Sequence, residues 1–99
     1  MEDCLLTLFV PPSIEETLVD WLLEHASIEG FSSAEAFGHG ARQNGMSLLE
    51  QVTGRQRRVQ FLIHLKRDQA ERILDELRST FAGVGLHYFL TPLLDAGRL

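Results

Sequence analysis

Residues 59–66 alternate strictly between apolar and other side chains, and this pattern constrains the fold more than any other in the sequence. The apolar set is Val59, Phe61, Ile63 and Leu65, and the set between them is Gln60, Leu62, His64 and Lys66. A period of two residues places the two sets on opposite faces of a β-strand. We therefore predict a strand with one strongly apolar face, which a second layer of structure must cover.

Three further stretches have the composition of strands. Residues 4–10 form an apolar run that ends at Pro11 and Pro12, neither of which can donate a hydrogen bond to a sheet. Residues 31–37 alternate between larger side chains and the small ones of Ser32, Ala34 and Ala36. Residues 86–91 form the last predicted strand, which ends before Pro92.

Two segments between the strands show helical periodicity. Ser13 and Glu16 have the spacing of a capping box, so we expect a helix to begin at Ser13. Its apolar stripe consists of Ile14, Leu18, Trp21, Leu22 and Ala26. Asp68 and Glu71 form a second capping pair, and the helix that they predict runs from about residue 69 to about residue 81, before Gly83 and Gly85.

The order strand, helix, strand, strand, helix, strand is that of the ferredoxin-like βαββαβ fold. We predict one α+β domain over residues 1–99, with a four-stranded antiparallel sheet and both helices on one of its faces. The other face would carry Leu5, Phe9 and Leu62, and no further chain is left to cover it. Association of identical chains would bury this face, so we predict a homo-oligomer.

Composition argues against two classes of partner. The chain has 14 acidic and 9 basic residues, and its net charge of −5 opposes a general attraction to nucleic acid. No apolar segment approaches the ~20 residues of a membrane-spanning helix, and no signal-peptide pattern opens the chain. We therefore expect a cytoplasmic protein that does not insert into membranes. Cys4, the single cysteine, is expected to be a small buried side chain.

No motif in the sequence indicates an enzyme. Neither serine nor cysteine occurs in a recognisable nucleophile motif, and the G-x-x-x-x-G-K-[ST] phosphate-binding loop does not occur. An acylphosphatase would carry an arginine-glycine loop after its first strand, where this chain has Pro11, Pro12 and Ser13. We therefore predict a protein without catalytic residues.

Residues 38–57 form the connection between two predicted strands, and a connection of about twenty residues is long for a compact domain unless it has a function. Its glycines, Gly38, Gly40 and Gly45, interrupt any regular pattern. Its apolar group consists of Met46, Leu48 and Leu49, followed by Glu50. This group is either a docking patch for a partner protein or a helical turn that folds onto the sheet.

The one concentration of positive charge in this acidic chain consists of Arg42, Arg55, Arg57 and Arg58. Forked guanidinium groups bind phosphate and carboxylate oxygens, so an anionic ligand at the base of the loop is one interpretation. The alternative is an exposed strand end at which the arginines pair with Glu35, with Glu50 or with a neighbouring subunit.

Candidate metal ligands show no compact spacing such as H-x-x-x-H or C-x-x-C. His39 is the best candidate, because it lies between two glycines and can be completed by Glu35, by Glu50 or by copies of itself from other chains. The alternative for the four histidines is structural. It gives His39 a hydrogen-bonding role, His25 a partly exposed place on a helix, and His64 and His87 positions packed on a sheet face.

Several stretches of the chain resemble the PII signal-transduction proteins, and most closely a family of small PII-like proteins encoded near heavy-metal efflux pumps. The stretches that carry this resemblance are Gly38-His39-Gly40, residues 51–60 (QVTGRQRRVQ), His87-Tyr88 and Ala96-Gly97-Arg98. The resemblance implies a ferredoxin-like trimer, similar in architecture to CutA, with effector clefts between subunits. It also implies ligand-binding roles for the turn with Gly83 and Gly85 and for Arg98. The lysine that PII proteins carry in this turn is absent here.

The function that the resemblance implies is that of a regulatory sensor. An anion, a nucleotide or a metal would bind between subunits, and the loop 38–57 would contact a partner. The implied partner is a membrane transporter or another efflux component, in heavy-metal efflux or tolerance. The sequence identifies no cofactor. Two alternatives are a metal-binding or metal-delivery protein that uses His39, and a purely structural interaction module.

Overall fold

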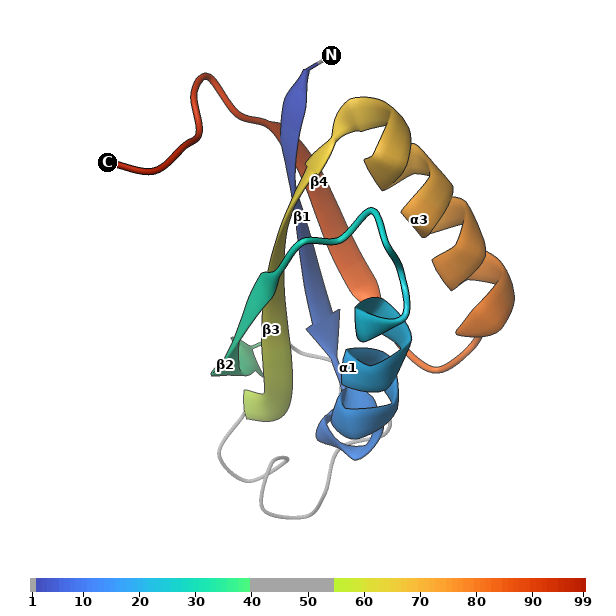
Figure 1. The fold of residues 1–99 in the computed structure, drawn as a ribbon. Helices are drawn as coiled ribbons and strands as arrows, with labels where there is room; N and C mark the ends of the chain where they lie inside the picture. Colours follow the sequence, from blue (N-terminus) through green and yellow to red (C-terminus); the bar gives the residue numbers. More distant parts are fainter. Residues whose placement is uncertain (1, 40–54) are drawn as a thin grey trace.

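The computed structural model describes residues 2–39 and 55–99 of the chain. Within these ranges the chain forms strands, two α-helices and one short 3-10 helix (Figure 1). The strands are β1 (Asp3–Val10), β2 (Phe31–His39), β3 (Arg55–Lys66) and β4 (His87–Pro92). The helices are η1 (Pro12–Ile14), α1 (Glu15–Leu23) and α3 (Arg67–Thr80).

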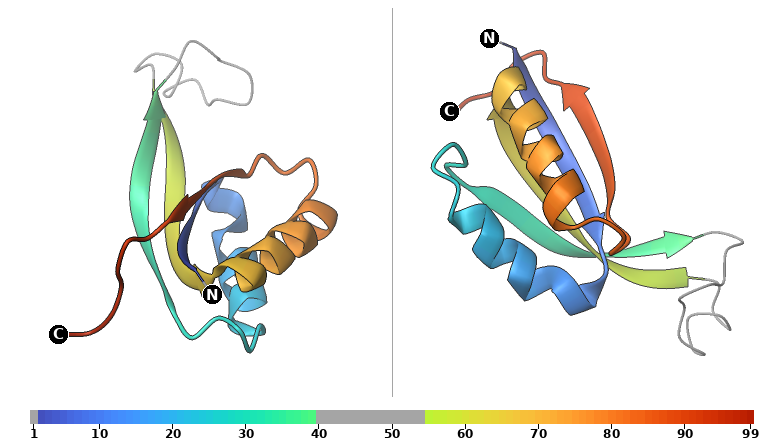
Figure 2. Two further views of the ribbon diagram at one scale, coloured as in Figure 1. Left: turned by 90° about the horizontal axis from the view of Figure 1, so that it is seen from above. Right: turned by 90° about the vertical axis from the view of Figure 1, so that its right-hand side faces the viewer.

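The strands form one antiparallel sheet in the order β2-β3-β1-β4. Leu6 of β1 lies opposite Ile63 of β3 on one side and opposite Leu90 of β4 on the other. At the edge formed by β2, Phe31 also lies opposite Ile63. Both helices cover the same face of the sheet (Figure 2). The predicted ferredoxin-like fold is therefore confirmed.

The hydrophobic core lies between the sheet and the two helices. In β3 the predicted alternation is observed, because Val59, Phe61, Ile63 and Leu65 are all buried. The helices contribute Leu18, Leu22, Ala70, Ile73, Leu74 and Leu77, and Phe81 closes the core beyond α3. Cys4 is buried on the same face of the sheet, as predicted. Removing this apolar surface from water is the main contribution to the stability of such a domain.

Both predicted capping boxes are wrong. α1 begins at Glu15 without a side-chain cap, because the 3-10 turn of η1 already leads the chain into the helix, and Ser13 lies inside that turn. α1 also ends at Leu23, so Ala26 lies beyond it and is exposed. α3 begins at Arg67, directly after β3, and the amide of Lys66 donates to Oε1 of Gln69 at 3.1 Å. In the described ranges, neither helix combines the length and apolar character needed to cross a membrane.

The predicted bounds of the long connection, 38–57, are wrong at both ends. β2 continues through His39 and β3 begins at Arg55, and these two residues lie opposite each other. Gly38 is also part of the ladder, opposite Gln56. The strand ladder extends beyond the apolar alternation because backbone hydrogen bonds do not require apolar side chains. The two strands therefore form a ribbon longer than the part of the sheet that covers the core.

Within the described residues no element covers the second face of the sheet, as predicted. Its side chains include Leu5, Thr7 and Phe9 of β1, Gln60, Leu62 and His64 of β3, and His87, Phe89 and Thr91 of β4. Leu62 and Phe89 expose 38% and 52% of their surfaces. Residues 93–99 leave the sheet on the side away from the helices (Figure 2), and Leu94 and Leu99 are fully exposed. We call this uncovered surface the open face.

Candidate functional site

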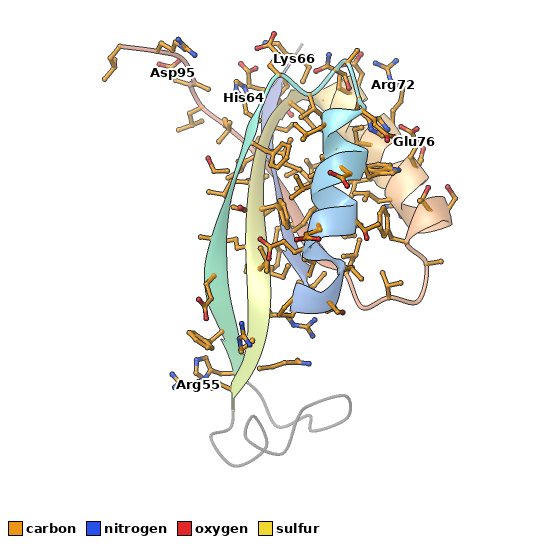
Figure 3. The ribbon with its side chains drawn as sticks, turned by 60° about the horizontal axis from the view of Figure 1, so that its bottom comes forward. Arg55, His64, Lys66, Arg72, Glu76 and Asp95 are labelled. Atoms are coloured by element: carbon orange, nitrogen blue, oxygen red, sulfur yellow. The ribbon has the colours of Figure 1, made fainter. Side chains whose placement is uncertain are left out.

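One end of the sheet collects several of the predicted ligand-binding residues. β2 ends here at His39, opposite Arg55. β1 ends at Val10, and β4 begins at His87. Figure 3 shows Arg55 at this end of β3, with His64 and Lys66 at the other end. We call this region, formed by residues 35–39, 55–58, 10–12 and 83–87, the arginine end of the sheet.

The three arginines at the start of β3 have different neighbours. The guanidinium carbon of Arg55 lies 4.7 Å from the centre of the Phe37 ring, a cation–π contact. Nε of Arg57 lies 4.0 Å from Oε1 of Glu35. Nη2 of Arg58 donates a 2.9 Å hydrogen bond to Oε1 of Gln56. The Arg57–Glu35 pair is one that the structural interpretation predicted, but both side chains are mostly exposed, and exposed ion pairs of this kind are weak.

A hollow of about 290 Å³ lies against two of these arginines. Its lining comes from β2, β3 and the start of α1, and consists of Ser33, Ala34, Glu35, Arg57, Arg58, Val59, Pro12 and Glu15. The hollow therefore carries two cationic and two acidic side chains. An anion that enters it would compete with Glu35 for Arg57. The sequence pattern predicted the arginines but not Glu15 or Ser33, which the fold brings to them.

The predicted glycine turn lies on the other side of β1. Gly83 and Gly85 have φ angles of +77° and +88°, a region that other residues rarely adopt, which confirms a left-handed turn after α3. A Cβ at Gly85 would lie 3.7 Å from Cγ of Pro11, so the turn borders the end of β1. Because β3 and β4 flank β1, the strands that carry Arg58 and this turn are about 10 Å apart.

Arg98 is not brought to the arginine end within one chain. It lies in residues 93–99, which follow β4 from the opposite end of the sheet, where Pro92 lies opposite Cys4. These residues project on the side of the open face (Figure 1). The role that the resemblance implies for Arg98 would therefore need a neighbouring chain.

The predicted metal ligands Glu35 and His39 both belong to β2. They share one face of the strand but are four positions apart, which corresponds to about 13 Å along it. In the described ranges no three histidine, cysteine or acidic side chains are grouped as a metal site would require. Several other predicted residues, Arg42, Met46, Leu48, Leu49 and Glu50, lie outside the described residues.

Asp3 is the centre of a charged cluster that sequence analysis did not predict. Its Oδ1 accepts hydrogen bonds from Nζ of Lys66 at 2.7 Å and from Nε2 of His64 at 3.0 Å. The hydrogen bond from Lys66, together with that from His64, lowers the pKa of the Asp3 carboxyl. The cluster depends on the register that places Asp3 opposite Lys66, and no single stretch of sequence contains that information.

His25 links the two helices, a role that was also missed. It follows α1 instead of lying on it, and its side chain is 19% exposed. Nδ1 contacts the Trp21 carbonyl oxygen at 2.7 Å, and Nε2 contacts Oε1 of Glu76 at 3.3 Å. The ring also packs against Trp21 with 4.1 Å between ring centres. These contacts are structural and lie far along the molecule from the arginine end.

Solved structures with the same architecture come from several proteins. A DUF3240 family protein from Shewanella baltica OS155 matches with a TM-score of 0.81 and 22% identity, over 100% of this chain and 98% of that chain. CPII, a nitrogen regulatory PII-like protein from Thiomonas intermedia K12, was solved bound to ADP, AMP and bicarbonate. It matches with a TM-score of 0.72 and 15% identity, over 100% of this chain and 97% of that chain. CutA1 from Pyrococcus horikoshii matches with a TM-score of 0.72 and 12% identity, over 95% of this chain and 86% of that chain.

These likenesses show that the chain has the fold that is also found in PII-like and CutA proteins. No curated protein matches the sequence at a significant level. Residues 1–99 match the family described as "Protein of unknown function (DUF3240)". The chain therefore belongs to the DUF3240 family.

Proposed function

We propose that this protein is a PII-like regulatory protein without catalytic activity, which binds a small anionic effector at the arginine end of the sheet. The observation that carries the proposal is the hollow beside Arg57 and Arg58. It lies beside the β2–β3 ribbon, which continues to His39 and Arg55 and leads into residues 40–54. Occupation of the hollow would act on that segment through the ribbon.

The size of the hollow limits the effector. A volume of about 290 Å³ holds about ten non-hydrogen atoms at the ~30 Å³ that one water takes in the liquid. Bicarbonate, inorganic phosphate or the phosphate of a nucleotide fits, whereas a whole nucleotide would extend beyond it. The ligands named for CPII, which are ADP, AMP and bicarbonate, include members of both groups. For the larger ligands, the remaining atoms would lie toward the Gly83–Gly85 turn or against a neighbouring chain.

The open face supports assembly into a homo-oligomer. Phe9 and Phe89 make a T-shaped contact with 6.1 Å between ring centres, and His87 packs edge-on against Phe89 at 5.1 Å. Leu62 lies on the same face, and the neighbouring positions of β2 carry the small side chains of Ser32 and Ala34. A second chain would bury this surface with a gain of roughly 25 cal/mol per Å² of apolar area. The number of chains, three, rests on the PII-like fold.

Regulation would follow from a difference in affinity. An effector shifts the equilibrium between two states of residues 40–54 only if it binds one of them more tightly. The segment with Met46, Leu48, Leu49 and Glu50 would then contact the partner in one state. The partner that the sequence resemblance implies is an efflux component or membrane transporter in heavy-metal tolerance, and the cytoplasm is the compartment in which such a regulator would act.

Isothermal titration calorimetry tests the effector class directly. The purified protein is titrated with bicarbonate, phosphate, AMP and ADP, and separately with Cu(II), Zn(II) and Ni(II). We expect saturable binding of at least one anion. The double variant Arg57→Gln, Arg58→Gln should weaken it by about tenfold or more for each arginine that contacts the ligand, since hydrogen bonds to charged groups contribute about 1.5–3 kcal/mol.

Arg72→Gln is the matched control, because Arg72 is exposed on α3 and pairs with Asp68 at 3.6 Å, away from the hollow. Its affinity for the anion should equal that of the wild type. Unchanged anion binding in the double variant would contradict the proposal. Stoichiometric metal binding that disappears in His39→Ala, without any anion binding, would favour the metal-delivery alternative instead.

A further inference from the structure

A second cavity, of about 400 Å³, lies on the helix side of the sheet. It is bounded by the end of α3, by residues 81–86 and by β4. Its floor belongs to the hydrophobic core, since Leu8, Leu74 and Leu77 are each less than a tenth exposed. Tyr88 of β4 lies opposite Leu8 and lines the cavity with it. The sheet therefore separates this cavity from the open face.

The lining near the glycine turn consists of very small residues. Ala82, Gly83 and Gly85 all border the cavity. Both glycines have positive φ angles, so replacement by a larger residue is disfavoured by the backbone itself. A Cβ at Gly83 would have no atom within 4 Å, which shows open space beside the turn. The backbone conformation thus keeps this side of the cavity free of side chains.

The polar groups of the cavity lie together at one position on its rim. Nη2 of Arg78 donates a 3.1 Å hydrogen bond to the hydroxyl oxygen of Tyr88, and Nη1 donates a 2.8 Å hydrogen bond to Oδ1 of Asp75. The guanidinium carbon lies 5.8 Å from the centre of the Tyr88 ring. These contacts hold the cation beside the cavity. Because the Tyr88 oxygen accepts from Arg78, its own proton is available for a second acceptor.

We propose that this cavity binds a small amphiphilic carboxylate, whose apolar body lies along Ala82, Leu86 and the Tyr88 ring and whose carboxylate contacts Arg78 and the Tyr88 hydroxyl. The volume corresponds to about a dozen non-hydrogen atoms at the ~30 Å³ of one liquid water, the size of a medium-chain fatty acid or a small aromatic acid. A buried apolar surface with a few convergent polar groups is the usual form of a small-molecule site.

The charge distribution favours an acid over a neutral ligand. Arg78 is the cation that lines this cavity, and its guanidinium is shared between Asp75, which is exposed, and Tyr88. The bond to Asp75 lies between residues three apart on the helix surface, a class of pair that contributes little. A ligand carboxylate can therefore take over part of the guanidinium without a large loss. The cavity shares the Gly83–Gly85 turn with the arginine end, but Arg57 and Arg58 line the other hollow, on the far side of β1.

The test uses octanoate as the probe, measured by calorimetry or by displacement of 8-anilinonaphthalene-1-sulfonate. Octanol supplies the same chain without the charge, and acetate supplies the charge without the chain. We expect octanoate to bind at least about tenfold more tightly than either. Octanol lacks the hydrogen bond to a charged group, which corresponds to that factor, and acetate lacks the apolar chain, which contributes about 0.8 kcal/mol, or about fourfold in affinity, per buried methylene. Equal affinity for octanoate and octanol, or no octanoate binding at millimolar concentration, would overturn the proposal.

Four variants locate the site. Arg78→Met should reduce octanoate affinity about tenfold and leave octanol unchanged, whereas Arg72→Met, on the same helix, should change neither. Ala82→Trp fills the cavity from its small-residue side and should weaken both ligands. Leu62→Glu, on the open face, should have no effect. Loss of octanoate binding in Leu62→Glu, with Arg78→Met unchanged, would place the ligand on the open face and overturn the assignment.

Discussion

Asp3 offers a titratable group whose effect on stability has a defined sign. Its pKa is lowered by the hydrogen bonds from Lys66 and His64, from an ordinary value of 3.8. The folded state therefore binds this proton less tightly than the unfolded state. The stabilisation by Asp3 is present above the ordinary pKa and is lost as the pH falls through the folded value. We predict that Asp3→Asn destabilises the protein near neutral pH and that this difference shrinks in acid.

Urea unfolding of the wild type and Asp3→Asn, measured between about pH 7 and about pH 2, checks this prediction. In Lys66→Met the main cause of the shift is removed, so the same carboxyl should contribute less to the pH dependence. A difference between wild type and Asp3→Asn that is constant across the whole range would contradict the prediction. It would show that the substitution acts through packing and not through the ionised carboxyl.

At this scale the sequence predicts which way a side chain faces better than what it contacts. The period of two in β3 correctly separated Phe61 and Ile63 from Leu62 and His64. The partners of His64 and His25 were not predictable, because they come from β1 and α3 and depend on register and helix packing. The same limit applies to the arginine hollow, where Glu15 comes from the start of α1.

The turn between α3 and β4 is the element whose backbone is most restricted. Gly85 has a φ of +88°, and its Cβ position lies 3.7 Å from Pro11. We predict that Gly85→Ala destabilises the protein by about 1 kcal/mol, since the left-handed conformation costs an L-residue about 1–2 kcal/mol and the less flexible unfolded chain offsets part of this. Chemical denaturation gives the value. Gly30→Ala, where nothing lies within 4 Å and φ is not positive, is the control and should be neutral or slightly stabilising.

The starts of the helices provide a second prediction at this scale. Gln69 accepts the amide proton of Lys66, whereas no side chain caps the start of α1. Gln69→Ala should therefore cost about 0.5–1 kcal/mol, and Ser13→Ala should cost less, because only the first removes a hydrogen bond. Free energies of unfolding in urea distinguish the two. A larger loss in Ser13→Ala than in Gln69→Ala would show that the Ser13 hydroxyl stabilises the turn of η1.

The order of elements was predictable from sequence, but their ends were not. Each strand has an apolar period that identifies it, and proline or glycine marks most of the boundaries. The β2–β3 ribbon extends to His39 and Arg55 through polar and glycine residues, so periodicity alone ended both strands too early. The α3 start was missed for a related reason. β3 runs directly into it, and the amide of Arg67 donates to the Glu2 carbonyl at 2.9 Å instead of to a capping side chain.

For the whole molecule, the fold explains where the two candidate sites occur. The hollow beside Arg57 borders the start of α1, and the cavity beside Arg78 borders the end of α3, so both lie where strands and helices end. Sequence analysis predicted the arginine end from its positive charge, because the four arginines Arg42, Arg55, Arg57 and Arg58 stand out in an acidic chain. For the cavity beside Arg78, the resemblance implied only the Gly83–Gly85 turn as ligand-binding. Arg78 and Tyr88 were not predicted, because only the packing of α3 against β4 brings them together.

The last prediction concerns the open face, on which the assembly depends. Leu62 is 38% exposed in the centre of this face, and Leu23 is 67% exposed on α1, on the helix side. Leu62→Glu would place an unpaired carboxylate in the interface between chains, where its desolvation costs several kcal/mol. We predict that Leu62→Glu is a folded monomer at micromolar concentration, whereas Leu23→Glu retains the mass of the wild-type oligomer.

Size-exclusion chromatography with light scattering measures these masses against the 11.2 kDa of one chain. Circular dichroism should show the same secondary structure in both variants, because neither leucine belongs to the buried core. If the wild type were itself monomeric, or if Leu62→Glu kept its oligomeric mass, the open face would not be the interface. Leu23→Glu makes the comparison specific, since it introduces the same charge at a more exposed leucine and differs in the side of the sheet on which that leucine lies.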